Sequence, residues 1–167
     1  MTTVGDVVAQ LERWYDPAWA EPWDTVGLFS GDPGRTVGAV HVAVDPTEPV
    51  ALEAAAHGAG LLVTHHPLFL GGATSVARTG PKGRTLALLD ALYVAHTNAD
   101  VADPGVSDAL AAALGVTGLV PLQPQDDPLD RRAARPSTRG LGRIGTLPES
   151  LALQDFCGYV ADRLPRT

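Results

Sequence analysis

Two short segments of the sequence carry side chains of the types that bind metal ions. His65 and His66 are adjacent and precede a proline, and His96 is followed four residues later by Asp100. Neutral imidazole and carboxylate form a mixed nitrogen and oxygen ligand set that suits Zn, Mn, Fe, Co or Ni. A carboxylate can also bridge two ions, which lie about 3.5–4 Å apart in paired hydrolytic sites. The pattern predicts a site for two divalent ions with His65, His66 and Asp100 as ligands.

Each of these segments also has an ordinary structural interpretation. A pair of adjacent histidines commonly lies on the surface or in a hydrogen-bonded turn, and Asp100 could close a loop by hydrogen bonding near His96. His96 itself is a further candidate, as a ligand or as a group that handles protons. Asp45 could cap the helix that follows it, or support a metal ligand as a hydrogen-bond partner.

Other polar segments give weaker indications. The glycine-rich loop over residues 71–83 precedes a predicted helix, and Lys82 and Arg84 nearby could contact a small anionic substrate. The loop matches no P-loop spacing, so a flexible loop is the favoured interpretation. Cys157 is the one cysteine in the sequence, which excludes an intrachain disulfide and a cysteine-based zinc site.

The hydrophobic pattern predicts the elements that would have to position these ligands. Helices are expected over 4–14, 48–57, 84–92, 106–114 and 151–164, and strands over 37–44, 61–64, 93–95 and 141–145. Because strands alternate with helices, we predict an α/β fold with a mostly parallel sheet and helices on both faces. Asp45, His65 and His96 each follow a predicted strand, and ligands bind beyond the carboxyl ends of parallel strands.

The same pattern predicts how the chain is divided. Residues 1–120 are expected to form a metal-binding α/β lobe, and residues 121–140, rich in Pro, Asp and Arg, a flexible connection. Residues 141–167 are expected to be the incomplete start of a second segment. A further strand would be expected after the last predicted helix, so we expect a protein truncated at its C-terminus.

Charge and hydropathy exclude several classes of partner. The net charge of −7 argues against a nucleic-acid-binding surface, which needs a basic patch, and weakly against an anionic membrane surface. No apolar run approaches the ~20 residues of a membrane span. The N-terminus also lacks the basic and apolar regions of a signal peptide. We therefore expect a cytoplasmic protein.

Five segments, in this order, resemble the Nif-three-like family, whose members are also called GTP cyclohydrolase 1 type 2 homologs or dinuclear metal centre proteins. They are WDTVGL at 23–28, VAVDPT at 42–47, THHPLF at 64–69, AHTNAD at 95–100 and GVSDALAAALG at 105–115. A weaker match, over 140–156, resembles the start of the family's later segment. The resemblance implies a two-lobed α/β protomer that assembles as a toroidal homohexamer, with a dinuclear site opening toward a central cavity.

The resemblance also implies roles for individual residues. His65 and His66 look like the ligands of the family's paired-histidine segment, and Asp100 looks like its bridging carboxylate. The family completes the site with a His and a Glu near its C-terminus, spaced H-x-x-x-E, whereas no histidine follows His96 here. This departure implies either a fragment or a protein that has lost part of its site.

Three functions remain open at this point. The first is a metal-dependent hydrolase that acts on a nucleotide or phosphoester, in which two ions lower the pKa of a bound water. For this first function, the family name implies hydrolytic ring-opening of GTP as the reaction. The second is a non-catalytic metal-binding protein with an interaction or regulatory role, and the third is an inactive truncated fragment.

Overall fold

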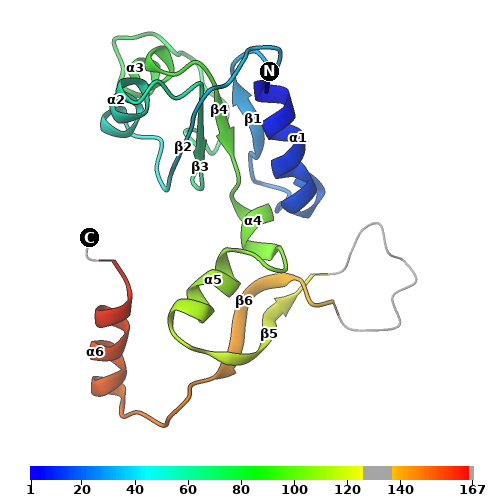
Figure 1. Ribbon diagram of the computed structural model, residues 1–167, viewed down its shortest axis with the longest axis vertical. Coiled ribbons are helices and arrows are strands. Elements are labelled where there is room, and N and C mark those ends of the chain that lie inside the picture. Colours follow the sequence, from blue (N-terminus) through cyan, green and yellow to red (C-terminus); the bar gives the residue numbers. More distant parts are fainter. Residues whose placement is uncertain (126–136, 166–167) are drawn as a thin grey trace. The chain divides into compact units, whose positions relative to one another are not determined.

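The computed structural model describes residues 1–125 and 137–165 (Figure 1). The chain forms two compact units, Met1–Ala99 and Asp100–Thr167. The sequence pattern predicted that the first lobe ends near residue 120, after the helix over 106–114. In the structure that helix belongs to the second unit. Within the described residues, no helix is both long and apolar enough to cross a membrane.

The first unit is built on a four-stranded sheet with the strand order β1-β4-β3-β2. Its strands are β1 (Gly27–Ser30), β2 (Val40–Ala43), β3 (Leu61–Thr64) and β4 (Leu92–Val94). Strand β3 pairs in parallel with both β2 and β4, whereas β1 pairs antiparallel with β4. The sheet is therefore mixed, and the prediction of a mostly parallel sheet was wrong. The alternation of strands and helices gave no sign of β1, because this strand follows a segment without helix or strand periodicity.

Helices cover both faces of this sheet, as predicted. On one face, α1 (Val4–Trp14) packs against a buried cluster that includes Leu61, Val63 and Tyr93. On the other face, α2 (Glu48–Ala56) and α3 (Pro81–Leu88) pack against Leu62 and Leu92. Successive strand residues point to opposite faces. This explains why β3, lying between two parallel neighbours, is buried at every position.

The ends of the helices follow from local sequence. The side chain of Thr3 accepts a hydrogen bond from the Asp6 N–H, and the Asp6 carboxylate accepts one from the Thr3 N–H. This capping box satisfies N–H groups that the first turn of α1 leaves unpaired. Thr47 caps α2, with Pro49 in the first turn, and Gly58 follows its end with a φ of 66°. A left-handed glycine is a common helix stop.

Two elements near the candidate ligands differ from the prediction. Helix α3 begins at Pro81 and ends at Leu88, so the strand that precedes His96 starts earlier than expected. No helix or strand was predicted between residues 96 and 105, but a short helix, α4 (Thr97–Val101), lies there. Asn98 accepts a hydrogen bond from the His96 N–H and so supports the start of α4, a local contact that hydrophobic periodicity does not reveal.

The second unit contains α5 (Val106–Ala113), β5 (Thr117–Pro124), β6 (Gly140–Thr146) and α6 (Leu153–Arg163). Strands β5 and β6 form an antiparallel pair. The strand expected over 141–145 and the helix expected over 151–164 are thus confirmed, with shifted ends. The predicted flexible connection over 121–140 overlaps both strands at its ends, and its middle, 126–136, lies outside the described residues.

Candidate metal centre

The candidate ligands lie at one edge of the first unit's sheet. Strands β3 and β4 are parallel neighbours, with Thr64 opposite Val94, so their carboxyl ends reach the same edge. His65 and His66 directly follow β3, and His96 follows β4 after one residue. The hydrogen bond from the Ala95 N–H to the Thr64 carbonyl keeps the two strand ends together beyond the last paired residues.

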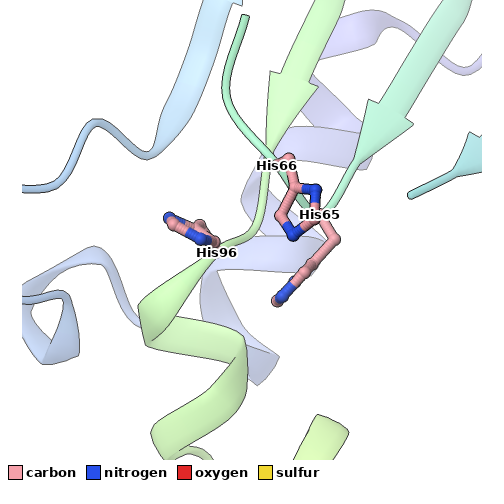
Figure 2. A group of neighbouring side chains, drawn as sticks. All are labelled: His65, His66 and His96. Atoms are coloured by element: carbon pink, nitrogen blue, oxygen red, sulfur yellow. The ribbon is translucent and has the colours of Figure 1, made fainter. Parts of the chain in front are cut away.

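The three histidine side chains converge (Figure 2). One ring nitrogen from each of His65, His66 and His96 lies within 4.8 Å of the other two. The ring centroids are 5.1 Å apart for His65 and His66, 5.1 Å for His65 and His96, and 5.7 Å for His66 and His96. Because a Zn–N bond measures about 2.1 Å, this spacing is close to what one shared ion requires.

In each imidazole, Nδ1 lies within hydrogen-bond distance of an oxygen atom. The pairs are His65 with the Ala95 carbonyl at 3.0 Å, His66 with Asp45 Oδ1 at 2.7 Å and His96 with Asp24 Oδ1 at 2.8 Å. Carbonyl and ionised carboxylate oxygens only accept hydrogen bonds, so each neutral ring carries its proton on Nδ1. The lone pair is then on Nε2, which is the arrangement usual for metal-ligating histidines.

Asp24 makes the most extensive of these contacts. Its side chain is fully buried, and it also accepts hydrogen bonds from the N–H and hydroxyl groups of Thr97. Burial raises the pKa of the Asp24 carboxyl, but the hydrogen bonds from His96 and Thr97 together lower this pKa by more, to below its ordinary value. Asp24 is therefore ionised at neutral pH.

Sequence reasoning missed Asp24 as a functional residue. It lies in the WDTVGL segment, 72 positions from His96, and no periodicity connects the two. The only available signal was a charged residue between Trp23 and a short apolar run. The exposed indole of Trp23 also lies beside the site, edge-on to His96 at a centroid distance of 6.0 Å.

Asp45 lies beside His66, with its side chain 58% exposed. It is not the cap of α2, because the Thr47 side chain accepts the hydrogen bond at that helix end. Asp100 lies in α4 and is half-buried, and its backbone carbonyl accepts a hydrogen bond from Ser107. Asp100 is the first residue of the second compact unit, whereas the three histidines belong to the first. The role of Asp100 as a metal ligand therefore stays a prediction from the sequence.

The other two histidines of the sequence, and the cations Lys82 and Arg84, lie in contacts away from this cluster. His41 and His57 stack on each other with ring centroids 5.9 Å apart. Arg84 pairs with Glu48 at 2.9 Å, and the Lys82 ammonium lies 4.6 Å from the centre of the Phe69 ring. Each of the two cations thus has a partner within the chain, and their contact with a small anionic substrate stays a prediction from the sequence.

The three imidazoles form a donor set that suits a divalent ion of intermediate hard–soft character. Three neutral imidazoles are the protein ligands of several catalytic zinc sites, which keep a further position open for water or substrate. Imidazole also suits Cu, Fe and Ni, so the donors alone do not select one metal. His66 is 47% exposed at its side chain and His96 15% exposed, so solvent reaches this edge of the sheet.

Comparison with known proteins gives consistent matches. A family model described as Duf34/NIF3 (NGG1p interacting factor 3) matches residues 2–167. A "GTP cyclohydrolase 1 type 2 homolog" from Streptomyces coelicolor is 45% identical over 171 residues, covering 100% of this chain and 58% of that protein. One from Mycobacterium tuberculosis is 48% identical over 118 residues, covering 68% of this chain and 31% of that protein.

Solved structures match the fold as well. The Staphylococcus aureus hypothetical protein SA1388 has a TM-score of 0.86 at 26% identity, covering 97% of this chain and 64% of that chain. Reduced HcgD from Methanocaldococcus jannaschii has a TM-score of 0.76 at 27% identity, covering 96% and 59%. The chain thus spans less than two thirds of the length of each of these relatives.

Proposed function

Since the chain belongs to the Duf34/NIF3 family, we propose that it binds divalent metal ions through His65, His66 and His96. One observation carries this proposal: three ring nitrogens from two neighbouring strand ends lie within 4.8 Å of one another. The oxygen atom that contacts each Nδ1 supports the proposal further, because this contact leaves the lone pair of each ring on Nε2.

The proposed complement is two ions, drawn from Zn, Mn, Fe, Co and Ni. Three imidazoles can supply the protein ligands of one ion. Asp100, four residues after His96, is the proposed bridging carboxylate to the second. Titration of the purified protein with Zn²⁺ tests this count, because a second equivalent should bind only while Asp100 is present.

The proposed reaction is hydrolysis of a nucleotide or phosphoester. The bound ion would supply Lewis-acid activation of water at neutral pH. The residues of the chain would hold the proton on Nδ1 of each ligand and leave the exposed edge of His66 open to substrate. The curated relatives carry the name GTP cyclohydrolase 1 type 2 homolog, which makes GTP the first substrate to assay.

The direct test combines elemental analysis with turnover. We expect the purified protein to bind divalent metal, and the His65→Ala and His96→Ala variants to bind much less. His57→Ala is the matched control, because His57 lies in the separate stacked pair with His41. Equal metal content in all of these proteins would overturn the metal site. Metal binding without turnover of GTP or phosphoesters would overturn only the hydrolase.

A non-catalytic interaction protein is the second candidate, and one surface favours it. Strand β2 lies at the sheet edge. Val40 and Val42 in this strand are 41% and 74% exposed, and Val44, just after it, is 59% exposed. Exposed apolar rows of this kind occur at contact surfaces. In this case chelation should release a bound partner, while no substrate is turned over. Assembly into a homohexamer is also a proposal, which light scattering of the purified chain tests.

A further inference from the structure

We propose that Asp24 is a positioning residue that fixes which ring nitrogen of His96 is offered to a metal ion. The inference rests on the proposed metal site, but the contacts that carry it do not involve the metal. We further infer that Asp24 acts more strongly on His96 than Asp45 acts on His66.

The acceptor capacity of Asp24 is fully used. Oδ1 accepts from Nδ1 of His96 at 2.8 Å and from the Thr25 N–H at 2.7 Å. Oδ2 accepts from the N–H of Thr97 at 3.0 Å and from its hydroxyl. Four donors thus surround one buried carboxylate, which has no hydrogen atom to give to any of them. His96 must therefore present a protonated Nδ1 to Asp24.

Thr97 holds this carboxylate in place. Its hydroxyl accepts a hydrogen bond from the Glu21 N–H at 3.0 Å and donates its own hydrogen to Asp24. The direction of the hydroxyl is thereby set by a backbone group on one side and a carboxylate on the other. The segment from Glu21 to Thr25 is connected in this way to the start of α4, and Asp24 cannot move away from His96 without breaking several hydrogen bonds.

Asp45 differs from Asp24 in its exposure to water. The two contacts have almost the same length, 2.7 Å for Asp45 with His66 and 2.8 Å for Asp24 with His96. The Asp45 side chain is 58% exposed, whereas that of Asp24 is fully buried. Water competes for an exposed carboxylate and screens its charge. The buried pair should therefore control its imidazole more tightly than the exposed pair does.

The first experiment reads the tautomers directly, in metal-free protein. Nitrogen-15 NMR of the histidine rings, recorded over a range of pH, distinguishes a protonated Nδ1 from a protonated Nε2. We expect His96 to be protonated at Nδ1 in the unaltered protein. A His96 ring protonated at Nε2 and not at Nδ1 would overturn the proposal without any substitution, and so without the risk of a variant that does not fold.

The second experiment compares two matched substitutions, Asp24→Asn and Asp45→Asn. The new amide at position 24 keeps both hydrogen bonds from Thr97 only when its oxygen takes the Oδ2 position, and its NH2 group then faces the Thr25 N–H and Nδ1 of His96. We expect Asp24→Asn to move His96 toward a protonated Nε2 and to weaken Zn²⁺ binding about 10–100-fold, the usual effect of losing such a partner. We expect Asp45→Asn to weaken binding less than about fivefold, as for an exposed pair.

The outcomes separate this inference from the proposed function. If Zn²⁺ binds and Asp24→Asn alters neither the His96 tautomer nor the affinity, the positioning role is overturned while the metal site stands. Equal loss of affinity in both variants would overturn the ranking of the two carboxylates. If the unaltered protein binds no metal but its His96 carries the Nδ1 proton and loses it in Asp24→Asn, the positioning role stands and the metal site fails.

Discussion

Arg143 and Asp108 form a two-point ion pair in the second unit, with Nε and Nη2 of the arginine each 2.6 Å from a carboxylate oxygen. The remaining N–H groups donate to the carbonyls of Ala102, Gly140 and Gly142. All five donors of the guanidinium are thus used, and the side chain is only 4% exposed. This one residue connects β6 to the start of α5.

The first prediction concerns the stability of the second unit. Arg143→Met should lower its free energy of unfolding by about 3 kcal/mol, because it leaves the Asp108 carboxylate and three carbonyls without their donor. Amide hydrogen exchange of β5 and β6 measures this locally. The exposed Arg78→Met should change the exchange by less than about 0.5 kcal/mol. Equal exchange in the two variants would show that the pair contributes nothing.

The second prediction concerns acid. Burial raises the pKa of Asp108, but hydrogen bonds from Arg143 and the Gly105 N–H, with the charge of Arg143, lower this pKa further than burial raises it. The folded pKa therefore lies below the unfolded value of about 3.9, so the ionised group stabilises the fold above that pH. This contribution is lost as pH falls through the folded pKa.

Urea unfolding at a series of pH values checks the sign of this effect. The unaltered protein should lose stability below about pH 4 more steeply than Asp108→Asn, which has no carboxyl to protonate at this position. A carbon-13 NMR titration of the Asp108 carboxyl should give a pKa below the ordinary value. Parallel stability curves for the two proteins would contradict the prediction.

The third prediction concerns addition and removal of metal. An ion that binds only the folded chain stabilises it, by about 2.7 kcal/mol at a free concentration 100 times its dissociation constant. Zn²⁺ should therefore raise the melting temperature of the first unit, and a chelator should reverse the rise. His65→Ala should lose this response and His57→Ala should keep it. A rise that survives in His65→Ala would place the ion elsewhere.

The fourth prediction uses Trp23 as a reporter. Its indole lies 6.0 Å from the His96 ring, measured between centroids, and is exposed. Co²⁺ bound at the histidine cluster should quench its fluorescence, because paramagnetic ions quench indoles at short range. Trp23→Phe should therefore lose more of the Co²⁺-dependent quenching than Trp14→Phe does. The reverse order would mean that the ion binds away from His96.

The sequence predicted the helices and strands whose formation depends on residues close to one another in the chain. The spacing of apolar residues and the capping residues predicted α1, α2, α5 and β3 with small errors at their ends. These predictions succeeded because helix caps and turn residues act within a few positions of themselves. Strand β1 was missed and the sheet was called mostly parallel, because its antiparallel pairing with β4 depends on a distant segment.

For the candidate site, the sequence by itself determined which residue types were present and that His65, His66 and His96 followed strands. It also supported the resemblance that led to the family. Only the tertiary structure decided that ring nitrogens of the three histidines lie close together and that Asp24 accepts a hydrogen bond from His96. The physical reason is that side-chain convergence depends on strand order and register, which arise from packing between segments as far as 76 positions apart.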